Sequence, residues 1–151
     1  MDSRAKVDAL IAKHGYDEAA VIAILQDIQE EKRYVPADML RHLAERLHLS
    51  LARLYGIATF YKAFSLKPKG RHVCCVCTGT ACHVKGAPTL IDKLEQDLKI
   101  RPGSTTPDLR FTLETVNCVG ACALAPLVVV DEDHLAKMTV AKLEKGLRSY
   151  R

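Results

Sequence analysis

Four cysteines in two short loops are the residues best suited to chemistry in this chain. Cys77 and Cys82 enclose Thr-Gly-Thr-Ala, and Cys118 and Cys122 enclose Val-Gly-Ala. Each pair follows an apolar stretch that reads as a β-strand, so neighbouring strands would bring all four thiols to one end of a sheet. Four convergent thiolates are the ligand set of an iron-sulfur cluster or of a structural zinc ion.

The small residues between these cysteines suit an anionic centre. Two ferric ions, two sulfides and four thiolates sum to a charge of minus two, and one-electron reduction makes it minus three. Backbone N–H groups of residues 78–81 and 119–121 can face such an anion, and Gly79 and Gly120 let the chain pass close to the sulfurs. Cys82 also falls near the start of a predicted helix, where the helix dipole favours negative charge.

Spacing alone favours iron-sulfur but leaves a structural zinc open. Structural zinc usually takes cysteine pairs separated by two residues, up to four, so gaps of four and three residues are possible but not typical of zinc. They also differ from the plant-type ferredoxin spacing. A third hypothesis is a thiol-disulfide oxidoreductase that uses Cys74 and Cys77. Those two cysteines lie in an apolar stretch rather than at a helix N-terminus, so we predict Cys74 and Cys75 to be buried packing thiols.

Composition narrows the function classes. The chain has 151 residues, 48% of them apolar, and a net charge of +4 from 22 basic and 18 acidic residues. The charges are scattered and Trp is absent, which disfavours a nucleic-acid partner. No apolar run approaches the roughly 18 residues of a membrane span, and the N-terminus lacks an export signal, so we expect a cytoplasmic protein without membrane insertion. Cysteines in that setting indicate metal or redox chemistry.

Residues 1–66 have the apolar periodicity of helices packed as a small bundle. Gly15 ends the first predicted helix, Asp17 and Ser50 are N-cap residues of the second and fourth, and Pro36 lies in the first turn of the third. The apolar stripes are Val7, Leu10 and Ile11; Val21, Ile22, Leu25 and Ile28; Met39, Leu40, Leu43 and Leu47; and Leu51, Leu54, Ile57 and Ala58.

A change of composition at residues 67–70 marks a linker, and residues 67–151 have the pattern of an α/β domain. The predicted elements are strands at 72–77, 111–116, 127–130 and 134–138, a loop at 103–108, and helices at 88–98 and from Thr139 onward. This order is typical of an open sheet backed by helices. No catalytic triad, carboxylate pair or phosphate-binding glycine loop is present, so we expect no catalytic residues.

Several segments together resemble one known family over nearly the whole chain. They are residues 76–83, 103–108, 118–122 with Ala125-Pro126, 24–29, 34–36 and 55–61. The chain resembles the thioredoxin-like [2Fe-2S] ferredoxins, a family that includes the small iron-sulfur subunit of NADH:quinone oxidoreductase (complex I). Relatives of that subunit serve NAD-dependent formate dehydrogenases and NAD(P)-linked or electron-bifurcating hydrogenases.

The resemblance implies a specific set of properties. The domain at 67–151 would have a thioredoxin-like fold, and one [2Fe-2S] cluster would be held by Cys77, Cys82, Cys118 and Cys122. Electrons would pass to or from a partner subunit that alone carries FMN and binds NAD(P), and the helices at 1–66 would help to dock on that subunit. Leu109 and the turn at 131–134 depart from the family pattern, at the rim and away from the four cysteines.

Overall fold

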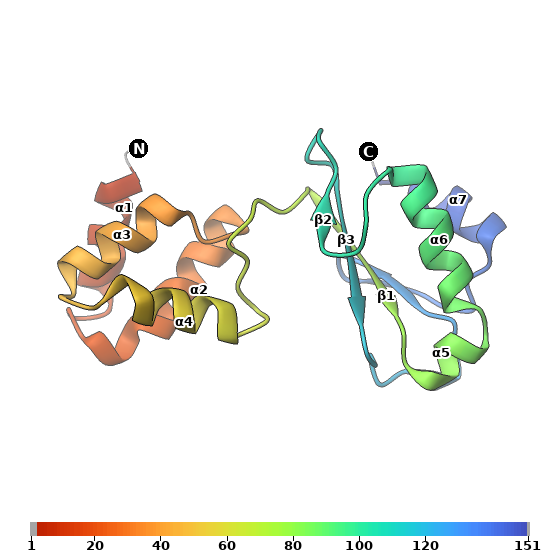
Figure 1. Ribbon diagram of the computed structural model, residues 1–151, viewed down its shortest axis with the longest axis horizontal. Helices are drawn as coiled ribbons and strands as arrows, with labels where there is room; N and C mark the ends of the chain where they lie inside the picture. The colour runs from red at the N-terminus through yellow and green to blue at the C-terminus, as the bar shows by residue number, and fades with distance from the viewer. Residues whose placement is uncertain (1–2, 151) are drawn as a thin grey trace. The chain divides into compact units, whose positions relative to one another are not determined.

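The structure, a computed structural model, describes residues 3–150 and divides into two compact units between Pro68 and Lys69 (Figure 1). The first unit is helical, and the second combines helices with a five-stranded sheet. The mixed α/β class predicted from the sequence is therefore confirmed. Within residues 3–150, no helix has the length and apolar character needed to cross a bilayer.

The helical unit follows the predicted caps closely. Its elements are α1 (Ser3–Lys13), η1 (Glu18–Ala20), α2 (Val21–Lys32), α3 (Ala37–Arg46) and α4 (Leu51–Phe60). The Asp17 carboxylate accepts a hydrogen bond from the Ala19 N–H at 2.9 Å, and the Ser50 hydroxyl accepts one from the Arg53 N–H at 3.2 Å. Asp17 thus caps the 3-10 turn that leads into α2, and Pro36 occupies the N-cap position of α3 rather than its first turn. Apolar side chains from the four α-helices form one core, whose largest fully buried members are Ile11, Ile24, Leu25, Ile28, Met39, Leu40, Leu43 and Leu54.

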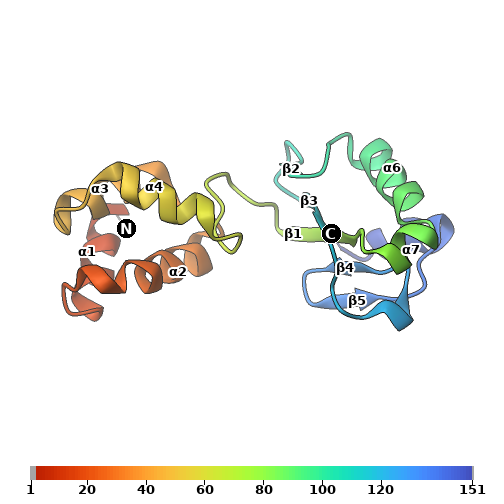
Figure 2. The same ribbon diagram turned by 60° about the horizontal axis from the view of Figure 1, so that its bottom comes forward.

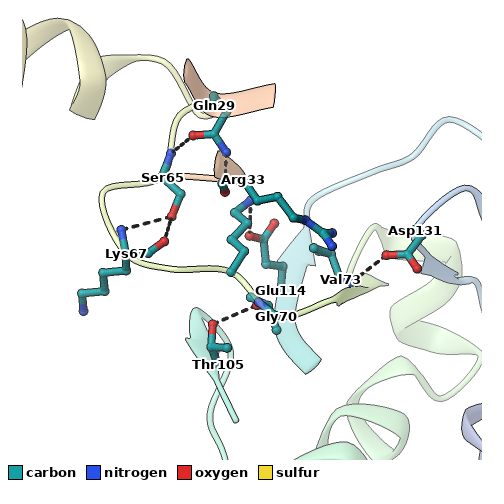
Figure 3. A network of polar contacts seen from close by, with 11 residues as sticks. Gln29, Arg33, Ser65, Lys67, Gly70, Val73, Thr105, Glu114 and Asp131 are labelled. Atoms are coloured by element: carbon teal, nitrogen blue, oxygen red, sulfur yellow. Dashed lines mark hydrogen bonds and ion pairs between the residues drawn. The ribbon is translucent and has the colours of Figure 1, made fainter. Parts of the chain in front are cut away.

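The Gln29 side chain joins the end of α2 to the segment that follows α4 (Figure 3). Its Nε2 donates to the Arg33 carbonyl at 2.7 Å, and its Oε1 accepts from the Ser65 N–H at 2.9 Å. Arg33 has a left-handed conformation (φ 65°), so its carbonyl has left the helical ladder. Gln29 therefore satisfies one backbone carbonyl at the end of α2 and one backbone N–H in the segment after α4.

Gln29→Ala is expected to lower the free energy of unfolding by about 1–3 kcal/mol, because two backbone groups lose their partner. Thermal unfolding followed by circular dichroism measures the change. The control is Gln26→Ala, which alters an exposed glutamine on the same helix. Equal destabilisation by both substitutions would contradict a bridging role for Gln29.

The second unit contains an open, mixed sheet. Its elements are β1 (His72–Cys77), α5 (Thr80–Val84), α6 (Ala87–Leu98), β2 (Ser104–Thr105), β3 (Phe111–Val116), η2 (Cys122–Leu124), β4 (Val128–Val130), β5 (Asp133–Leu135) and α7 (Val140–Leu147). The strand order is β2-β3-β1-β4-β5, which Figure 2 shows in sequence across the sheet. β1 is parallel to β3, and every other pairing is antiparallel.

Helices α6 and α7 pack on one face of this sheet. Leu90 and Leu94 of α6 and Leu143 of α7 lie in one core with the strand residues Cys74, Val76, Leu113, Val128 and Val130. A parallel pair such as β1 and β3 needs a long crossover connection, and α5 and α6 form it. The helix predicted at 88–98 corresponds to α6, and the crossover also contains the short helix α5, which ends before Gly86, whose φ of +101° suits glycine.

Candidate functional site

The parallel pairing of β1 and β3 places the two cysteine loops side by side. The last residue of β1, Cys77, is opposite Val116 at the end of β3, and Cys118 follows two residues later. Parallel strands end at the same edge of a sheet, which in Figure 1 is the lower edge, beside α5. Cys82 lies on α5 and Cys122 begins η2, so both loops return a second thiol to this edge.

All four predicted cysteines come together there. The Cys77 thiol interacts with the thiols of both Cys82 and Cys118, and the Cys118 thiol interacts with that of Cys122. Cys77 and Cys82 are each only 3% exposed, whereas Cys118 and Cys122 are exposed. The set of four thiols therefore has a buried half, Cys77 and Cys82, against the core and an open half, Cys118 and Cys122, toward solvent.

Backbone N–H groups from three segments point at the sulfurs. Gly79 and Val119 donate to Cys77, and Gly120 donates to Cys118 Sγ at 3.3 Å. Each of these donors was predicted from the small residues of the loops. A fourth donor, the Leu127 N–H to Cys82, was not predicted, because Leu127 reads only as an apolar strand residue.

One expectation about donors is wrong: the Thr78 N–H donates to the Val116 carbonyl at 2.8 Å and is thus not available to a sulfur. Cys82 does lie near the start of a helix, as predicted, although α5 has only five residues and therefore a small dipole. Stabilisation of negative charge comes instead from individual N–H groups close to sulfur.

The pKa values of the thiols reflect this environment. Burial by itself raises the pKa of Cys77, but the Gly79 and Val119 N–H groups and the neighbouring thiols outweigh it, and the pKa is lowered overall. Burial raises the pKa of Cys82, and the Cys118 thiol raises that of Cys122. Close thiols cannot all ionise without a cation between them, as expected of a ligand set made for metal.

Gly79 brings the two loops into direct contact. A Cβ placed on it would lie 2.7 Å from the Asn117 carbonyl oxygen and 3.4 Å from Cys118 Cβ. Gly120, in the other loop, has φ of +88°, a conformation that residues with side chains rarely adopt. Both glycines therefore shape the site for physical reasons, one through space and one through backbone conformation.

The remaining cysteines divide between the two faces of β1. Cys74 is fully buried in the core, as predicted, and burial raises its pKa to about 12. Cys75 is only half-buried, so the prediction that it is a buried thiol is wrong; its side chain alternates to the face without α6 and α7. Cys74 and Cys77 lie three residues apart along one extended strand, so their Cα atoms are about 10 Å apart, which is too far for a disulfide.

The residues at this edge fit a [2Fe-2S] cluster. The four thiols are soft donors with N–H groups beside them, and residues 76–91 and 115–130 contain no Asp or Glu. Among residues 3–150, no three or more His, Cys, Asp or Glu side chains are placed to hold one metal ion between them. The fit therefore rests on the donor set and its surroundings.

A sequence model of the thioredoxin-like [2Fe-2S] ferredoxins matches residues 7–151 of this chain. The chain belongs to this family. Its membership confirms the predicted resemblance, the thioredoxin-like fold and one [2Fe-2S] cluster as the cofactor. It also decides between the iron-sulfur and zinc hypotheses, which cysteine spacing had left open.

Characterised relatives of this ferredoxin are subunits of larger complexes. It is 37% identical over 144 residues to the NADP-reducing hydrogenase subunit HndA of Solidesulfovibrio fructosivorans, covering 95% of this chain and 82% of that one. It is 35% identical over 151 residues to a subunit of NADH-quinone oxidoreductase from Rhizobium meliloti, covering all of this chain and 90% of the relative. The corresponding NADH-quinone oxidoreductase subunit of Salmonella typhimurium is also 35% identical, over 92% of this chain and 85% of its own length.

The fold has a counterpart among solved structures. A crystal structure of an NAD+-reducing [NiFe]-hydrogenase in the air-oxidized state aligns with a TM-score of 0.71 and 21% sequence identity. The match covers 87% of this ferredoxin but only 22% of the hydrogenase chain, so it supports the fold and nothing more.

Proposed function

We propose that Cys77, Cys82, Cys118 and Cys122 hold the [2Fe-2S] cluster, and that this ferredoxin passes single electrons within an NAD(P)H-linked oxidoreductase complex. The observation that carries the proposal is the convergence of these four thiols at the carboxyl ends of β1 and β3. The bound cluster would supply reversible one-electron chemistry.

The protein's own residues set the conditions for that chemistry. Cys77 and Cys82 are shielded from water by the core of the second unit, and the Gly79, Val119, Gly120 and Leu127 N–H groups stabilise negative charge on sulfur. Cys118 and Cys122 face solvent and are the side through which electrons would enter or leave. In this proposal, no residue of this chain binds or transforms a substrate.

The partner in this proposal is a subunit that carries a flavin and binds NAD(P). Support comes from the relatives, whose names include an NADP-reducing hydrogenase and NADH-quinone oxidoreductases. The division into domains at 1–66 and 67–151, a docking role for the helical part on that subunit and a cytoplasmic location belong to the same proposal. Affinity purification of the native complex through a tag on this chain would identify the subunits and so the type of complex.

Anaerobic purification followed by metal analysis tests the cluster itself. We expect two irons and two acid-labile sulfides per chain, a coloured protein, and an electron paramagnetic resonance signal that develops only on reduction. A colourless protein with one zinc and no sulfide would overturn the proposal.

A further inference from the structure

Two exposed apolar side chains flank the thiol site. Val84, two residues after Cys82, is 79% exposed, and Leu124, two residues after Cys122, is 38% exposed. Most large apolar side chains of this unit are instead buried in the core beneath the sheet. Exposed apolar groups beside a redox site form a surface that a partner protein can cover.

Three exposed lysines lie next to these two side chains, in sequence or by contact, and we call them the basic rim: Lys85, Lys137 and Lys142. Lys85 directly follows Val84, at the end of α5. The Lys137 N–H donates to the Leu124 carbonyl at 2.8 Å, and Lys142 Nζ donates to the Lys137 carbonyl at 3.3 Å. Lys137 and Lys142 are therefore linked by contact to Leu124, and Lys85 is next to Val84 in the chain.

No carboxylate from the loops of the site balances this charge. The cysteine segments, 76–91 and 115–130, lack Asp and Glu altogether. On α7, Glu144 is paired with Lys93 of α6 at 2.8 Å, and Lys93 also pairs with Asp97. The acidic side chain next to the rim in sequence is thus engaged on the α6 side of its helix.

We propose that this face docks on an acidic surface of the subunit that exchanges electrons with the cluster. Val84 and Leu124 would lie at the apolar centre of the contact, and carboxylates of the partner would face the basic rim. An apolar centre with a charged rim is the usual anatomy of a specific interface, and complementary charge speeds and orients association. This inference rests on the proposed function and adds the chemistry of the partner surface.

Zero-length cross-linking of the native complex tests the contact directly. A carbodiimide joins a lysine amine only to a carboxylate that touches it, and mass spectrometry identifies the two residues. We expect links from the basic rim to Asp or Glu of one partner subunit. Lys99 is the control, an exposed lysine at the opposite end of α6. Links to partner carboxylates from Lys99 but from no rim lysine would overturn the inference.

Charge reversal provides an independent measurement. The double variant Lys137→Glu/Lys142→Glu should lower the amount of partner retained at roughly 0.15 M salt by at least about tenfold. Lys99→Glu/Arg101→Glu makes the same change in net charge away from the rim and should retain the partner. Equal retention by both variants would mean that the rim only offsets the charge of the cluster.

Iron and sulfide are measured on every variant, so the two proposals fail separately. A chain that holds its cluster but shows no dependence on the rim overturns the docking inference alone. A chain without iron and sulfide overturns the proposed function, while the cross-links still report which surface is in contact.

Discussion

A Cys118→Ala chain is expected to emerge from anaerobic purification with less than about a tenth of the iron and acid-labile sulfide of the parent chain. The substitution removes one of four thiolates, and a three-thiolate site leaves one iron without its fourth ligand. Because Cys118 is exposed, its loss creates no cavity in the core and the fold should persist. The visible spectrum and the iron and sulfide content measure cluster loss, and far-ultraviolet circular dichroism reports the fold.

Cys74→Ala is the matched control for this experiment. It removes a thiol of the same strand-loop region, but one that is buried among apolar side chains with a pKa raised to about 12. The cluster should remain at parent levels, and the free energy of unfolding should fall by ~1 kcal/mol from the cavity left behind. Similar cluster loss from both substitutions would mean that the four ligands have been chosen wrongly.

Gly79→Ala should destabilise the thiol site although it changes no ligand. The added methyl group would lie 2.7 Å from the Asn117 carbonyl oxygen, a backbone atom that moves only if the second cysteine loop moves. Displacing that loop shifts Cys118 relative to Cys77. We expect a loss of about 1–3 kcal/mol in the free energy of unfolding, together with faster loss of iron to a chelator.

Gly56→Ala adds the same methyl group where there is room for it. Gly56 lies on the exposed side of α4, and beyond its chain neighbours and the nearby backbone of its own helix nothing lies within 4 Å of the new Cβ. Alanine favours the helical conformation over glycine, so the helical unit should gain up to ~1 kcal/mol. We therefore expect the free energy of unfolding to fall in Gly79→Ala and to rise in Gly56→Ala. An undisturbed site in Gly79→Ala would show that the loops are not held by close contact.

Local patterns in the sequence predicted most of the secondary structure. Asp17 and Ser50 act as N-caps through their side chains, as predicted. The strands at 72–77 and 111–116 have the predicted bounds. Such features depend on residues within a few positions of one another, where side-chain chemistry and periodicity dominate. The two-residue strand β2 was not predicted, because Ser104 and Thr105 carry no apolar alternation and are ordered by pairing with β3.

Cysteine type and spacing, together with the family motifs, determined from sequence alone the cofactor and the choice of four candidate ligands. Only the tertiary structure decided how the site is built around them. It set the buried and exposed halves of the thiol group, the Leu127 N–H at Cys82, the contact of Gly79 with Asn117, and the meeting of Leu124 with Lys137. Each of these depends on strand pairing or loop contact between residues far apart in the chain, which local sequence patterns do not encode.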